Sequence, residues 1–163
     1  MVNSNMTSNC PSPNPECPAW AIWFDGSAHP NPGRIGLGVF LRDPEGRRHE
    51  FSAAASSSGC NNEAELLALE QALLMARTLG ALSVALHSDS DFVVKHVNGL
   101  AHTEVLHLKA LIQKVRRQLE GFPGSTLIWI PRHRNSDADR LSRAALGLPD
   151  KPGLHPGLLR RRR

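Results

Sequence analysis

WAIWFDG, residues 20–26, is the stretch that decides the fold. Its first five residues are apolar on both faces, which is typical of a central strand, and Asp25-Gly26 predicts a turn at its end. Side chains alternate between the two faces of a strand, so Asp25 shares a face with Trp23, where a core residue is expected. The stretch therefore predicts a buried strand that carries a carboxylate into an apolar environment.

The elements that follow alternate between strand and helix patterns. Two strands, Gly36–Leu41 and His49–Ala54, flank the turn residues 43–46 and predict an antiparallel meander. Leucines and alanines at helical spacing over Asn62–Leu79, with Gly80 after them, give the strongest helix signal. The remaining elements predicted are a strand at Ser83–His87, helices at Asp89–Val97 and Glu104–Leu119, a strand at Thr126–Ile130 and a helix at Asp137–Leu146. The order β-β-β-α-β-α-α-β-α predicts an α/β protein.

The composition is typical of one soluble globular domain. The chain has 163 residues, 40% hydrophobic and 21% charged, which suits a single full-sized core. It has no run of eighteen apolar residues and no secretory signal pattern at its N-terminus, so we expect neither a membrane span nor export. The three cysteines, Cys10, Cys17 and Cys60, form no even disulfide framework, and the first two lack a zinc-site spacing. These features favour a reduced, cytoplasmic compartment.

The positive charge is concentrated at the C-terminus. The chain carries 19 basic and 15 acidic residues, and four of the basic ones are Arg160–Arg163, so the rest of the chain is balanced at 15 and 15. A short arginine run predicts contact with a polyanion, although a solvated chain end explains it as well. We expect a disordered segment at residues 1–18, one folded domain at 19–147 and a flexible basic tail at 148–163.

Four carboxylates occupy positions that need an explanation: Asp25, Glu65, Asp89 and Asp139. A helix cap accounts for Asp89 or Asp139 taken alone. Glu65, however, lies on the apolar stripe of its helix, and burying an unpaired carboxylate costs several kcal/mol, a cost that a bound cation removes. Oxygen-rich clusters suit hard cations such as Mg²⁺ or Mn²⁺. Spacing alone leaves a metal site and separate structural roles as equal alternatives.

Four motifs together resemble those of type 1 ribonucleases H. They are FDGSAHPNPG (residues 24–33), NNEAE (61–65), SDS (88–90) and ADRLSR (138–143). They stand in the family's order with similar spacing, and they span residues 20–147. Any one of them occurs by chance, but all four fall on suitable predicted strands and helices. The resemblance implies a ribonuclease H-like fold, a mixed five-stranded sheet flanked by helices.

The resemblance also implies an activity. It implies an endoribonuclease that hydrolyses the RNA strand of an RNA–DNA hybrid with two metal ions, Mg²⁺ or Mn²⁺, and leaves 5′-phosphate and 3′-hydroxyl ends. The implied ligands and catalytic residues are Asp25, Glu65, Asp89 and Asp139. His133 matches a histidine that assists turnover in many members, although the loop here is short and a surface histidine without this role is an open alternative.

Substrate contacts follow from the same resemblance. A ribonucleotide differs from a deoxyribonucleotide by its 2′-hydroxyl, which backbone groups and short polar side chains can recognise. The matching positions are Gly26, Ser27, Asn31, Asn61 and Asn62, and the loop residues Arg132 and Arg134 are candidates for phosphate contacts. The two adjacent asparagines also suit the start of a helix, and both roles can coexist.

Two departures from the family pattern concern the grip on the substrate. Cys60 stands where the family often has a threonine in a pocket for a DNA phosphate, and a thiol is a poor hydrogen-bond donor. The basic protrusion of many bacterial members is also absent, because residues 98–103 lead directly into the next helix. Contacts to the substrate backbone must then come from the loop arginines, from the arginine tail, or from basic residues of the helix. These helix residues are Lys109, Lys114, Arg116 and Arg117, and a solvated helix face explains their presence as well.

Other functions remain open at this stage. A nuclease of the same superfamily could act on double-stranded RNA or a DNA junction, and a hybrid-binding module could lack catalysis. The two asparagines favour a hybrid substrate, and four carboxylates favour catalysis. A reverse-transcriptase fragment is not expected, because the chain has no polymerase portion. We expect a monomer whose partner is an RNA–DNA hybrid and not a membrane.

Overall fold

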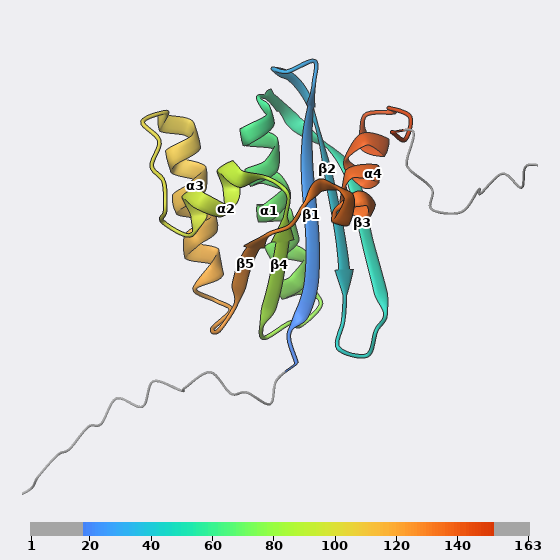
Figure 1. Ribbon diagram of the computed structural model, residues 1–163, viewed down its shortest axis with the longest axis vertical. Helices are drawn as coiled ribbons and strands as arrows, with labels where there is room; N and C mark the ends of the chain where they lie inside the picture. The colour runs from blue at the N-terminus through green and yellow to red at the C-terminus, as the bar shows by residue number, and fades with distance from the viewer. Residues whose placement is uncertain (1–17, 152–163) are drawn as a thin grey trace, which may run out of the picture.

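The computed structural model describes residues 18–151, which form one sheet with helices on both faces (Figure 1). The strands are β1 (Trp20–His29), β2 (Gly33–Arg42), β3 (Arg48–Gly59), β4 (Val84–Ser88) and β5 (Thr126–Trp129). The helices are α1 (Asn61–Thr78), α2 (Asp91–Val97), α3 (Leu106–Leu119), the 3-10 turn η1 (Arg132–Arg134) and α4 (Ser136–Ala145). The predicted order of strands and helices is confirmed, with η1 as an addition.

The sheet is mixed and five-stranded, with the strand order β3-β2-β1-β4-β5. Strands β1, β2 and β3 pair antiparallel, whereas β4 lies parallel to both β1 and β5. The register between β1 and β4 pairs Trp23 with His87. Two residues further along each strand, Asp25 and Asp89 therefore come level with each other at the carboxyl end of β4, where sites in α/β sheets commonly lie.

The helices cover the two faces of the sheet unequally. In Figure 1, α1, α2 and α3 lie to one side of the sheet, and α4 lies to the other, next to β2 and β3. The main core fills the α1 side, where Ile22 and Phe24 of β1 meet Leu66, Leu69 and Leu73 of α1, all of them buried. Residues of β1 with odd numbers, Asp25 among them, face α4 instead, because side chains alternate along the strand.

Two glycines let both helices approach the strand backbone closely. A Cβ added to Gly26 would lie 2.1 Å from the carbonyl carbon and oxygen of Ala64 on α1. One added to Gly38, the partner of Asp25 on β2, would lie 2.3 Å from the carbonyl oxygen of Ala138 on α4. These contacts bring the first turn of α1 against β1 and the first turn of α4 against β2, from opposite faces.

The turn expected at Asp25-Gly26 is wrong. Strand β1 continues to His29, and its pairing with β2 runs without a break from Asp25↔Gly38 to His29↔Arg34. Ladder hydrogen bonds to β2 outweigh the local turn preference of an Asp-Gly pair, as tertiary context often does. The correction matters because Asp25 sits inside a rigid central strand and not on a loop.

The chain ends bear on the predicted domain limits. Four residues of the predicted tail are described, and Leu148 N donates to the carbonyl oxygen of Arg143 at 3.0 Å, so this part returns to α4. Residues 1–17 of the predicted disordered segment (1–18) and the arginine run Arg160–Arg163 lie outside the described residues. Within residues 18–151, no helix has the length and apolar character needed to cross a membrane.

Candidate metal centre

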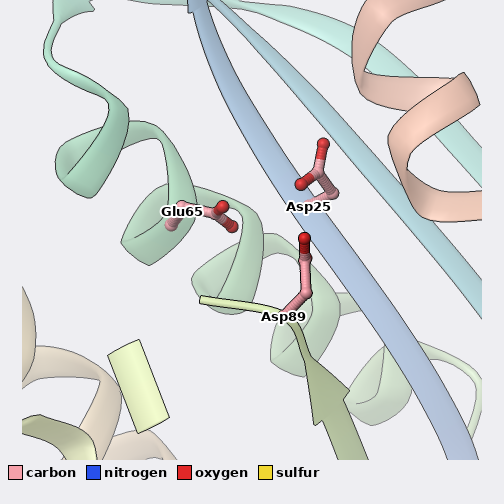
Figure 2. A group of neighbouring side chains, drawn as sticks. All are labelled: Asp25, Glu65 and Asp89. Atoms are coloured by element: carbon pink, nitrogen blue, oxygen red, sulfur yellow. The ribbon is translucent and has the colours of Figure 1, made fainter. Parts of the chain in front are cut away.

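Three carboxylates from separate elements meet at the centre of the sheet. Figure 2 shows Asp25 on β1, Glu65 on α1 and Asp89 just after β4, with their carboxyl groups turned toward one another. One oxygen from each lies within 4.8 Å of the other two. Asp25 is only 6% exposed, and the other two are half-buried. The structure thus brings together three of the four carboxylates that the sequence singled out.

Backbone and amide groups fix the orientation of two of these carboxylates. Gly26 N donates to Glu65 Oε2 at 3.1 Å, a contact that the close approach of α1 makes possible. Asn135, the residue before α4, donates from Nδ2 both to Asp89 Oδ1 at 2.8 Å and to the carbonyl oxygen of Phe24 at 3.0 Å. Asn135 therefore ties Asp89 to strand β1.

A pair of hydroxyls holds the third carboxylate. The buried Ser142 hydroxyl on α4 donates to Asp25 Oδ2, and Ser27 Oγ lies 2.8 Å from Ser142 Oγ. The sequence analysis missed both Asn135 and Ser142. Ser142 lies three residues after Asp139 and Asn135 four residues before it, so helical spacing places all three near one face of α4. That spacing is the signal that could have found them.

Burial and mutual repulsion favour the protonated form of these acids. Burial, with smaller contributions from Asp89 and Asp139, raises the pKa of Asp25 to about 7, against the opposing hydrogen bond from Ser142. Burial and the charges of Asp25 and Asp89 also raise the pKa of Glu65 well above its usual value. A bound cation would reverse both effects, because it stabilises the ionised carboxylates.

The fourth predicted ligand lies at the same pocket but outside the tight group. Asp139, in the first turn of α4, lines a pocket of about 410 Å³ together with Asp25, Glu65 and Asp89. Its Oδ1 is 2.6 Å from Lys151 Nζ. Across residues 18–151, the group of mutually close oxygens contains Asp25, Glu65 and Asp89 and not Asp139.

The donor set fits a hard divalent cation. All four acids offer oxygen, which Mg²⁺ and Mn²⁺ prefer, and no cysteine or histidine belongs to the group within the described chain. Three buried or half-buried carboxylates this close together are costly without a counter-charge. Arg132 supplies part of one, since its Nε lies 3.3 Å from Asp89 Oδ2, but its side chain is 80% exposed and outside the cluster.

The comparisons with known proteins agree on the family. A family profile described as "Reverse transcriptase-like" matches residues 23–145. The crystal structure of ribonuclease H1 from Halobacterium salinarum superposes with a TM-score of 0.76 at 30% sequence identity, over 80% of this chain and 98% of that one. The chain belongs to the type 1 ribonuclease H family. The predicted ribonuclease H-like fold is confirmed with it.

Further matches show how much of each relative this chain covers. The structure of LC11-RNase H1 in complex with RNA/DNA hybrid has a TM-score of 0.72 and 31% identity, over 78% of this chain and 96% of that one. The curated ribonuclease HI of H. salinarum is 32% identical over 76% of this chain. A bifunctional protein of Mycobacterium tuberculosis is 35% identical over 77% of this chain. This chain spans 62% and 35% of the lengths of these two curated relatives.

The residues predicted to contact substrate divide into two groups. The first group lines the pocket of about 410 Å³ next to the carboxylates: Gly26, Ser27, Asn61, Asn62 and Arg132. Asn61 Oδ1 accepts a hydrogen bond from Ala28 N at 2.9 Å, so this side chain also anchors α1 to β1.

The remaining predicted residues lie outside this pocket. Asn31 Oδ1 accepts a hydrogen bond from Asn61 N at 3.0 Å, so Asn31 helps to fix the first residue of α1 beside the pocket. His133 is exposed on η1 and lines a neighbouring hollow that Asp139 and Lys151 share, and Arg134 is exposed beside it. Their roles stay predictions.

Proposed function

We propose that this chain is an endoribonuclease that hydrolyses the RNA strand of RNA–DNA hybrids, using two Mg²⁺ or Mn²⁺ ions held by Asp25, Glu65, Asp89 and Asp139. The observation that carries the proposal is the approach of three carboxylates to within 4.8 Å of one another in a pocket that Asp139 also lines. The likeness to LC11-RNase H1, solved in complex with RNA/DNA hybrid, supports the choice of substrate.

The chemistry follows from the charges in the site. When bound, two divalent ions would lower the pKa of the attacking water, stabilise the leaving 3′ oxygen, and so give 5′-phosphate and 3′-hydroxyl products. The protein's part is to hold its carboxylates converged, while the bound cations would keep them ionised. Ser142, Gly26 N and Asn135 hold Asp25, Glu65 and Asp89 respectively, so little reorganisation is needed on binding.

Polar groups beside the carboxylates are the candidates for recognition of the ribose. Gly26, Ser27, Asn61 and Asn62 line the pocket beside the carboxylates, where a ribose 2′-hydroxyl can be met by short donors and acceptors. Asn31 supports this region through its hydrogen bond to the backbone of Asn61.

Basic residues of η1 are the candidates for phosphate contacts and proton transfer. Arg132 lies in the pocket, and Arg134 is exposed nearby on the same turn. Both can meet phosphates, which fix position without reading sequence. His133 is placed to assist proton transfer during turnover, since it lines the hollow next to Asp139. We further propose that the enzyme is monomeric and cytoplasmic, which sedimentation and cell fractionation test.

A cleavage assay on matched substrates tests the proposal. One sequence is prepared as an RNA–DNA hybrid, an RNA duplex and a DNA duplex, and each is incubated with the purified chain and Mg²⁺ or Mn²⁺, with and without EDTA. We expect cleavage of the RNA strand of the hybrid only, and none with EDTA. The products should carry 5′-phosphates.

Each other outcome identifies a different function. Cleavage of the RNA duplex at a similar rate would replace the hybrid-specific activity with a broader superfamily nuclease. Tight hybrid binding without cleavage under any metal would indicate a binding module. Undiminished cleavage in EDTA would contradict the metal-ion mechanism.

A further inference from the structure

A lysine from the end of the described chain enters the metal pocket. Lys151 Nζ lies 2.6 Å from Asp139 Oδ1, and both residues line the pocket that holds Asp25, Glu65 and Asp89. Lys151 belongs to a segment that the sequence predicts to be flexible, and its position at the site could not be read from any motif. It is the only lysine among the residues lining this pocket in the described chain.

Residues 148–151, which follow α4, bring the Lys151 ammonium group to the pocket. After α4, Leu148 N donates to the carbonyl oxygen of Arg143 at 3.0 Å. Arg143 in turn donates from Nε and Nη2 to the carbonyl oxygen of Pro149, at 3.0 and 2.8 Å. These two hydrogen bonds meet at the carbonyl oxygen of Pro149, whose φ is fixed by its ring. They therefore restrict the position of Lys151, two residues later. Lys151 is therefore held near Asp139 by backbone contacts as well as by charge.

The contact takes the place that a metal ion would need. The side chain of Asp139 is 22% exposed and that of Lys151 is 48% exposed, so the pair is less solvated than an ordinary surface pair. An ammonium 2.6 Å from Oδ1 fills one coordination direction of that oxygen. A divalent cation that approaches Oδ1 from this direction must first displace Lys151, and one bound elsewhere on the same carboxylate would be repelled by the ammonium charge.

We propose that Lys151 is an internal counter-ion of the metal-free enzyme, which occupies Asp139 and competes with the divalent cation for that carboxylate. The inference rests on the proposed function, because it takes Asp139 to be a metal ligand. Lys151 then weakens metal binding at Asp139 while keeping the metal-free carboxylate paired. A metal ion at the Asp25, Glu65 and Asp89 group is affected less, because the ion pair of Lys151 is with Asp139 and its charge acts on Asp25 only weakly.

A second lysine of the same pocket region provides a matched control. Lys95 Nζ lies 2.9 Å from Asp91 Oδ2, and Asp91 also lines the pocket. This pair is more exposed, at 54% and 68%, and Asp91 is no predicted ligand. Replacing Lys95 removes the same charge from the same neighbourhood without freeing a metal ligand.

Equilibrium binding of Mn²⁺ tests the proposal without any activity measurement. The metal-free wild type, Lys151→Gln and Lys95→Gln proteins are titrated with Mn²⁺ at fixed ionic strength, and unbound Mn²⁺ is counted by electron paramagnetic resonance. We expect Lys151→Gln to lower the Kd of the weaker Mn²⁺ site about two- to fivefold, the upper part of the range expected for losing one partly exposed ion pair. Lys95→Gln should leave both Kd values within about twofold.

A double-mutant cycle separates competition at Asp139 from a general loss of positive charge. In an Asp139→Asn background, Lys151→Gln should no longer change Mn²⁺ affinity, because the contested carboxylate is gone. An equal effect in both backgrounds would overturn the proposal, and so would equal Kd values for wild type and Lys151→Gln. Absence of any Mn²⁺ binding by the wild type would instead overturn the proposed function itself. Thermal melting of each variant verifies that it is folded.

Discussion

Replacing Asp25 by asparagine should stabilise the metal-free protein, although it destroys the metal site. Asp25 is buried between Ser142 and two other carboxylates, and its pKa is raised from 3.8 to about 7, first by burial. An acid with a higher pKa in the folded state binds more protons when folded between the two values. Raising the pH from about 4 to 7 therefore lowers the stability of the metal-free protein.

The size of this effect follows from the pKa difference. Each pKa unit corresponds to about 1.4 kcal/mol, so the rise from 3.8 to about 7 costs on the order of 4 kcal/mol once Asp25 is ionised. An asparagine keeps the shape and can still accept the Ser142 hydrogen bond, but its amide must also be buried. We expect a net gain of about 2–4 kcal/mol at pH 8, or roughly 5–12 °C in Tm.

Urea unfolding in EDTA measures the difference. Wild type, Asp25→Asn and the control Asp91→Asn, an exposed acid at the edge of the same pocket, are compared at pH 5 and pH 8. Asp25→Asn should exceed wild type by a clearly smaller margin at pH 5, where only part of the cost of the raised Asp25 pKa has developed, than at pH 8, while Asp91→Asn changes little. A variant less stable than wild type at pH 8, or a gain of the same size at both pH values, would refute the reasoning.

Three further variants test other parts of the account. Gly38→Ala should cost about 1–3 kcal/mol of stability and lower activity, because its Cβ would lie 2.3 Å from the carbonyl oxygen of Ala138; an unchanged urea midpoint would contradict the close approach of α4. His133→Ala should slow turnover roughly ten- to a hundredfold, and a rate unchanged across about pH 6–9 would mean that His133 has no part in proton transfer. Deleting Arg160–Arg163, which lie outside the described residues, should raise KM, less so at high salt, and leave kcat nearly unchanged; identical KM values at every salt concentration would make the tail irrelevant to binding.

The three clustered carboxylates were predictable because each one stands at an unusual position and falls within a motif of the family. Asp25 follows an apolar run, Glu65 stands on the apolar stripe of α1, and Asp89 comes directly after a short strand. These patterns depend only on neighbours in the sequence, and the fold brings them together through β1, α1 and β4. Element ends were less predictable. Asp89 was expected inside a helix, but α2 begins at Asp91, after Ser90, whose hydroxyl accepts from Val93 N.

The groups that orient the carboxylates could not be predicted in the same way. Ser142 contacts Asp25 only because Gly38 lets α4 lie against β2. Asn135, just before α4, meets Asp89, just after β4, although the two residues are 46 positions apart in the sequence. Lys151 depends on the hydrogen bonds of Arg143 to a backbone carbonyl. Such contacts arise from tertiary packing. The spacing of Asn135 and Ser142 from Asp139 marks them as neighbours along α4, but it does not tell which carboxylate each one meets.

The most direct test of the central claim compares wild type and Asp25→Asn in parallel on an RNA–DNA hybrid labelled on its RNA strand, in Mg²⁺ and in Mn²⁺. Both proteins are purified identically, so any contaminating nuclease contributes equally. The account predicts rapid cleavage by wild type and a fall of several orders of magnitude for Asp25→Asn, even though that variant is folded and at least as stable. Near-normal turnover by Asp25→Asn would contradict the assignment of the metal centre to Asp25, Glu65, Asp89 and Asp139.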